Sequence, residues 1–159
     1  MNVWKPTDHT GLYAALDALY AALDALCAAS LPQTELYTRI GQITSLRPEK
    51  GAAVAAAEYL QRTHPEITGV SPRNVRRMRD FYRAYENSPD LLAEAIRLGW
   101  TLNVVILEGC EDNVQRAWYL RAAQRSGWSK QELLTQIGAA ARENAPLDCD
   151  DEVCYTETQ

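Results

Sequence analysis

The sequence predicts an all-α protein: a single compact multi-helix domain with a helix-turn-helix-like element and an N-terminal leucine heptad helix. The chain has 159 residues, a length that suits one domain. Hydrophobic residues make up 47% of the chain, which is ordinary for a globular protein. Ala, Leu, Arg and Glu are plentiful and β-branched runs are short, so helix is favoured over strand.

A seven-residue repeat near the start of the chain predicts the first helix. The motif Leu-Tyr-Ala-Ala-Leu-Asp-Ala begins at Leu12 and again at Leu19, and a partial third copy begins at Leu26. Leucines spaced alternately by four and three form the seam of a coiled coil, or of a helix lying along another helix. Residues 12–26 therefore have two candidate uses, packing on their own domain or forming a homo-oligomer. Asp24 is expected on the solvated edge of this helix.

Turn-forming residues divide the rest of the chain into further helices, for a total of about seven. Ser88 and Asp112 are expected to cap two of them, and Ser129 opens a capping box before the last. Gly99 would kink the helix after Ser88 or mark a close approach. The expected helices after the first cover 35–43, 52–63, 72–85, 89–107, 113–126 and 130–144.

The helix after Asp112 is expected to have one apolar side. That side would contain Val114, Ala117, Trp118, Leu120 and Ala122. Tryptophans in a domain of this kind are expected as core or edge anchors rather than as base-stacking platforms, because aromatic side chains dominate core burial.

The stretch 70–85 is the most informative in the chain. Ser71 is a good N-cap and Pro72 suits the first helical position, so a helix is predicted to start here. At about 100° per residue the apolar side chains fall on one side, which predicts a buried face. Those residues are Val75, Met78, Phe81, Tyr82 and Tyr85. The opposite side carries Arg73, Arg76, Arg77, Arg79 and Arg83.

The basic side of this helix predicts a nucleic-acid interface, with DNA as the expected ligand. Arginine can pair with guanine or clamp phosphate, and asparagine can read adenine. The first turn of the second helix is where a helix-turn-helix presents such residues, and its N-terminus could hold a phosphate. The alternative is a solvated arginine face that is partly paired with acids such as Asp80 and Glu86. The candidate residues are Arg73, Asn74, Arg76, Arg77 and Arg83.

Charge is unevenly distributed along the chain. The net charge is −5, but residues 143–159 hold six acids and no Lys or Arg, and residues 35–142 carry +3. The middle is therefore mildly basic, which permits a local basic face but not a polybasic binder. The acidic tail is expected to be disordered. It could also fold back over the arginine face as an intramolecular mask.

Several motifs in residues 35–140 resemble the YhcG N-terminal domain family. The most specific is Gly69-Val70-Ser71-x-x-Asn74-Val75-x-x-Met78-Arg79-x-Phe81-Tyr82-x-x-Tyr85. Leu36-Tyr37-x-x-Ile40-Gly41 precedes it. It is followed by Leu98-x-Trp100, Arg116-x-Trp118-Tyr119-Leu120, Gly127-Trp128-Ser129 and Leu133-x-x-Gln136-Ile137. All stand in the family's order.

This resemblance implies a helical domain that in longer members precedes a PDDEXK-type nuclease domain. The family's role is inferred to be nucleic-acid binding or assembly of the nuclease, in bacterial mobile-element or defence settings, which implies a cytoplasmic protein. The chain after residue 140 has no nuclease strand pattern, so no catalytic residues are expected here. A separate nuclease or modification subunit is the alternative partner. The expected parts are a heptad helix (1–34), the helical domain (35–144) and the acidic tail (145–159).

Other function classes find little support. No metal site or cofactor is expected, because Cys149 and Cys154 lack further ligands nearby and the histidines at 9 and 64 are far apart in sequence. The thiols, which include Cys27 and Cys110, are expected to be reduced. No apolar run approaches the roughly 18 residues of a membrane span.

Overall fold

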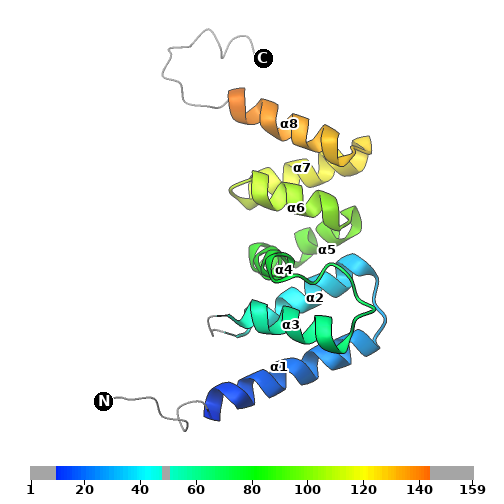
Figure 1. Cartoon of the computed structure of the whole chain (residues 1–159). Helices are drawn as coiled ribbons and strands as arrows, with labels where there is room; N and C mark the ends of the chain where they lie inside the picture. The colour runs from blue at the N-terminus through cyan, green and yellow to red at the C-terminus, as the bar shows by residue number, and fades with distance from the viewer. Residues whose placement is uncertain (1–9, 48–50, 144–159) are drawn as a thin grey trace, which may run out of the picture. The chain divides into compact units, whose positions relative to one another are not determined.

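The computed structural model describes residues 10–47 and 51–143, and within these ranges it is all-α, as predicted (Figure 1). The described ranges contain eight helices and no strand. The expectations for residues 1–9 and for the acidic tail lie outside them. The helices are α1 (Thr10–Ala28), α2 (Gln33–Ser45), α3 (Ala52–Thr63), α4 (Pro72–Tyr85), α5 (Pro89–Leu98), α6 (Trp100–Gly109), α7 (Asn113–Ser126) and α8 (Lys130–Glu143).

The chain forms two compact units, one ending at Trp100 and the other beginning at Thr101. In the first unit, α4 packs against α2, α3 and α5, and α1 packs against α2 and α3. The side chains between these helices are completely buried, which gives this unit an apolar core of its own. That core includes Leu23, Ile40, Leu60, Val75, Met78, Phe81 and Tyr85.

The contact between α2 and α4 depends on a glycine. A Cβ atom added to Gly41 of α2 would overlap the backbone carbonyl of Met78 in α4. Because that carbonyl belongs to a helix backbone, it cannot move aside as a flexible side chain could. Glycine therefore allows the two helices to approach more closely than any other residue would. This contact fixes the buried side of α4, on which the exposed side depends.

The leucine repeat packs inside the first unit. Leu19 is 2% exposed and Leu23 is fully buried, while Leu16 and Leu26 are half-buried. The middle of the seam is thus used in the way expected of a helix packed on its own domain. Homo-oligomer formation through residues 12–26 stays a prediction.

Local hydrogen bonds start and end the helices of the second unit as the sequence predicts. Asp112 Oδ1 accepts from the Gln115 backbone N–H at 2.9 Å at the start of α7. In the capping box of α8, the Glu132 N–H donates to Ser129 Oγ at 3.2 Å, and the Ser129 N–H donates to Glu132 Oε1 at 2.8 Å. Gly127 ends α7 in the left-handed conformation, with φ 66°.

The single helix predicted over 89–107 is two helices, and this prediction was wrong. Gly99 has φ 100° and ψ 157°, a conformation outside the helical region. It therefore ends α5, and α6 begins at the next residue. A Cβ atom at Gly99 would meet nothing within 4 Å, so the break reflects backbone conformation rather than close packing. The apolar run 104–107 is helical, as expected.

The prediction of a single apolar side on α7 was also wrong. Val114 is 81% exposed and Trp118 is 58% exposed, whereas Leu120 and Ala123 are buried. Val114 and Ala123 are nine positions apart, which places them about 180° apart around a helix. The apolar residues of α7 therefore occupy two opposite sides.

Candidate nucleic-acid interface

Helix α4 separates a buried side from a charged side. Val75, Met78, Phe81 and Tyr85 are fully buried. The Phe81 ring makes edge contacts with Tyr85 and Trp100, at centroid distances of 5.1 and 5.4 Å. Such aromatic contacts, together with the packing on α2, fix the rotation of the helix about its axis. The orientation of the opposite side is thereby fixed as well.

The opposite side of α4 presents three exposed arginines, Arg73, Arg76 and Arg83. At about 100° per residue they fall within an arc of about 80°, and they extend along about 15 Å of the helix axis. Asp80 is exposed within the same arc and lies 3.2 Å from Arg79 Nε. The helix holds five arginines against this one acid, so its exposed side is basic despite the acidic chain. We call Arg73, Arg76 and Arg83 the arginine face.

The two other predicted binding residues are placed differently. Arg77 is half-buried and already has an interaction within the chain. Asn74 Nδ2 donates to the Gly69 carbonyl at 2.6 Å, and Asn74 Oδ1 accepts from Trp100 Nε1 at 3.2 Å. Reading of a base by Asn74 would therefore require it to give up both bonds. Its observed bonds join the turn before α4 to Trp100, the last residue of the first unit.

The N-terminus of α4 has few donors left for an anion. Pro72 has no N–H, and the N–H of Asn74 donates to the Ser71 side chain at 3.1 Å. The predicted cap is thus confirmed, and the same cap uses a donor that a phosphate would need. Any anion contact on α4 would come chiefly from arginine side chains.

The connection between α3 and α4 is longer than the turn of about three or four residues in a simple helix-turn-helix. Side-chain hydrogen bonds from α2 and α3 hold it in place. Tyr37 Oη donates to the Thr68 carbonyl at 2.7 Å, and Gln61 Nε2 donates to the Val70 carbonyl at 3.1 Å. Gly69 has φ 76°, and a Cβ atom there would collide with Tyr37 Oη. These contacts hold the first turn of α4 in place.

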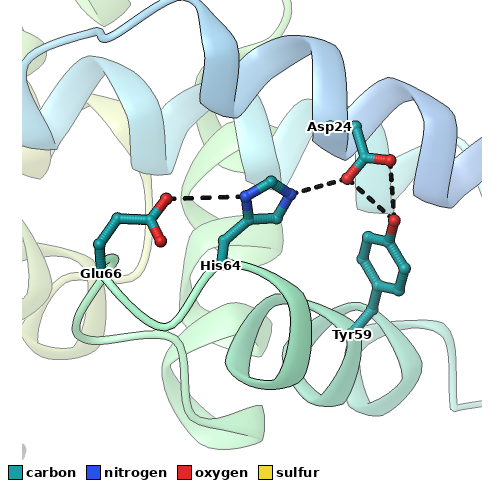
Figure 2. Close-up of polar contacts among 4 residues, drawn as sticks. All are labelled: Asp24, Tyr59, His64 and Glu66. Carbon is teal, nitrogen blue, oxygen red and sulfur yellow. Dashed lines mark hydrogen bonds and ion pairs between the residues drawn. The ribbon is translucent and has the colours of Figure 1, made fainter.

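A polar cluster on α1, α3 and the following turn was not anticipated from the sequence (Figure 2). Tyr59 Oη donates to the Asp24 carboxylate, lying 2.9 and 2.8 Å from its two oxygens. His64 Nε2 lies 2.7 Å from Asp24 Oδ1, and His64 Nδ1 lies 3.6 Å from Glu66 Oε2. We call Asp24, Tyr59, His64 and Glu66 the polar clasp.

The polar clasp fastens α1 to α3. The hydrogen bonds of the Asp24 carboxylate with His64 and Tyr59 hold the pKa of Asp24 below its ordinary value. The Asp24 carboxylate in turn raises the pKa of Tyr59. The Tyr20 and Tyr59 rings stack at 4.1 Å beside it. The interpretation of Asp24 as part of a solvated edge was therefore incomplete. No motif links positions 24 and 64, so only the tertiary fold reveals the pair.

The described cysteines have the properties of packed thiols. Burial raises the pKa of Cys110 to about 11 and also raises that of Cys27. A thiol with a raised pKa is a weak nucleophile, because the thiolate is the reactive form. Within the described ranges no group of three or more His, Cys, Asp or Glu side chains could hold a metal ion. No helix of the described chain is sufficiently long and apolar to span a bilayer.

The fold and this surface define an all-α domain whose central helix is anchored on one side and basic on the other. The chain matches the family described as DUF1016 N-terminal domain over residues 25–144, and it belongs to that family. This is the YhcG-type N-terminal family that its motifs resemble, and the domain is a non-catalytic part of it. No curated protein and no solved structure is significantly similar to the chain.

Proposed function

We propose that this protein is a non-catalytic nucleic-acid-binding module that contacts DNA through the arginine face of α4. The observation that carries the proposal is the separation of α4 into a buried apolar side and an exposed basic side. In this proposal the domain acts in the cytoplasm, where its DNA target would be.

Arginine suits this role for a physical reason. Its planar guanidinium can donate two parallel hydrogen bonds to a phosphate or to a guanine edge. Such contacts release counterions from DNA, so binding should weaken steeply with salt. Asp80 opposes the same interaction, because its carboxylate lies within the arc of the arginines. The proposed interface is therefore small and of moderate affinity.

Fluorescence anisotropy with a labelled DNA duplex at low salt tests the proposal. We expect binding in the micromolar range, a loss of at least about tenfold in the Arg76→Ala/Arg83→Ala variant, and a salt slope that falls by about 1 for each phosphate contact removed. Asp80→Asn should raise the affinity. An RNA duplex of the same sequence would establish the preferred nucleic acid.

Arg97→Ala is the matched control, because Arg97 is an exposed arginine on another helix, α5. This variant should bind like the unmodified protein. The proposal fails if no binding is detected at low salt, or if Arg97→Ala weakens binding as much as the α4 variant does.

A second candidate function is that of an interaction subunit that assembles with a separate nuclease or modification protein and makes no contact with nucleic acid. Exposed apolar side chains favour it, namely Leu46 at 68%, Val114 at 81% and Trp118 at 58%. Light scattering of the protein mixed with the product of a neighbouring nuclease or modification gene discriminates. A stable complex with no anisotropy change on DNA would favour this second function.

A further inference from the structure

Helix α7 has an exposed apolar patch that its own unit does not cover. Val114 and Trp118 lie one helical turn apart on the solvent side of α7. A Trp exposed by more than half is unusual in a surface that makes no contact, because its large ring gains much from burial. Trp118 also stands edge-on against the Tyr119 ring at 4.9 Å, which gives the patch a defined shape.

Charges flank this patch in a fixed order. Glu111 and Asp112 are exposed at the N-terminal end of α7, and Arg121 and Arg125 are exposed toward its C-terminal end. Around the helix, Val114, Trp118, Arg121 and Arg125 fall within an arc of about 60°. The two acids lie in the turn just before α7, so the exposed groups run from this acidic turn through the apolar patch to the basic end of the helix, and we call this run the stripe. Charges in this order also suit the helix dipole, but the dipole gives no reason for the exposed Val114 and Trp118.

We propose that this stripe is the interface for a second copy of the same chain, with the two α7 helices packed antiparallel about a two-fold axis near Trp118. A stripe with this order is complementary to itself only when the second helix runs in the opposite direction. The turn before one α7, which carries Glu111, then lies at the end of the other α7 that carries Arg125. A two-fold axis makes this contact twice.

The antiparallel arrangement covers the exposed apolar residues. The two Trp118 rings meet near the axis, Val114 of each copy lies one helical turn from them, and the two charged ends surround this apolar centre. An apolar centre with a polar rim is the usual anatomy of a protein interface. A single helix stripe is smaller than the roughly 800 Å² that each partner contributes to a stable complex. The dimer is therefore weak and depends on concentration.

The order of charges argues against nucleic acid as the occupant. Glu111 and Asp112 would repel phosphates at one end of the stripe, and an aliphatic side chain such as Val114 offers a base no hydrogen bond. A second copy satisfies the acidic, apolar and basic parts together. This inference is independent of the arginine face on α4.

Sedimentation velocity of the full chain, at about 1 to 500 μM protein, tests the dimer. The mass should rise from that of the 17.8 kDa monomer toward twice that value. Trp118→Ala should shift the midpoint to at least about tenfold higher concentration. Glu111→Arg and Arg125→Glu should each weaken the dimer, and the combined variant should recover most of the loss, because it restores opposite charges in exchanged positions.

Leu46→Ser is the matched control, because it removes another exposed apolar side chain from the other unit. It should leave the mass profile unchanged, and circular dichroism should show that every variant keeps its helices. A monomer at all concentrations overturns the proposal. So does a combined variant that is weaker than both single variants. A monomer that loses oligonucleotide binding on Trp118→Ala would overturn it in favour of a nucleic-acid surface.

Discussion

Helices α4 and α7 have the same length, 14 residues each, and both contain aromatic residues and several arginines, yet they use them differently. In α4 the apolar residues lie on one side, where all the predicted ones are fully buried except the half-buried Tyr82, and the exposed arginines lie on the other side. In α7 the apolar residues lie on both sides, and the solvent side has Trp118 and Val114 beside Arg121 and Arg125. The difference indicates that the first unit buries the apolar side of α4, whereas part of the apolar surface of α7 stays exposed.

Under the two proposals, the contrast predicts that the two surfaces bind different kinds of ligand. A side made of arginines with no large exposed apolar residue gains from charge, so its binding should be sensitive to salt. A stripe with an apolar centre gains from burial, so its association should survive higher salt and depend chiefly on Trp118. Measuring both associations at low and high salt would separate the two surfaces.

The largest expected effect is the difference in stability between truncating a buried aromatic residue of α4 and truncating an exposed one of α7. Phe81→Ala should lower the free energy of unfolding by about 3–5 kcal/mol, because it leaves a cavity in a fully buried site. Trp118→Ala should change the stability of the dilute monomer by no more than about 0.5 kcal/mol, because its ring is mostly in water. Chemical denaturation at low protein concentration measures both. If the two variants were equally unstable, the contrast between the helices would be refuted.

A smaller effect distinguishes the positioning residue of α4 from its exposed arginines. Asn74→Ala removes the bonds to the Gly69 carbonyl and to Trp100 Nε1, and it should cost about 1–3 kcal/mol by leaving these groups without their partner. Arg76→Ala should change stability by no more than about 0.5 kcal/mol and should weaken DNA binding instead. Thermal unfolding followed by anisotropy gives both readouts. An Asn74→Ala protein of unchanged stability would contradict the role assigned to this amide.

The smallest effect concerns the polar clasp, which joins α1 to α3 within the first unit. The pKa of Asp24 is lowered in the folded protein, so its carboxylate stabilises the fold at pH values above its ordinary pKa of 3.8. This stabilisation is lost as the pH falls through the folded pKa. Asp24→Asn should therefore be less stable than the unmodified protein at about pH 6, and this difference should vanish at lower pH. Urea unfolding at several pH values measures it. A difference that is independent of pH would show that Asp24 does not act through its charge.

The sequence predicted α4 well because several local signals agree there. The Ser71 cap, Pro72 and the spacing of the apolar residues each indicate the same helix and the same buried side. At Gly99 the sequence predicts a kink or a close approach, whereas the backbone conformation ends the helix there. In α7 the apolar residues point in different directions around the helix, so their number alone does not predict one buried side, and Trp118 is exposed.

The polar clasp shows why contacts between distant segments of the chain could not be predicted from the sequence. Asp24 and His64 are 40 positions apart, and each is an ordinary surface residue in its own segment. Only the packing of α1 against α3 brings them together. Contacts of this kind follow from tertiary structure and leave no local pattern in one sequence.

The packing of α1 also bears on where this domain can be cut. The family match begins at residue 25, whereas α1 begins at Thr10 and delivers Leu19, Leu23 and Asp24 to the first unit. A fragment that starts at residue 25 would leave the sites of both leucines empty and Tyr59 without its acceptor. The range that matches the family and the segment that folds thus begin at different residues. An expression fragment of this domain should include the whole of α1 and not begin at residue 25.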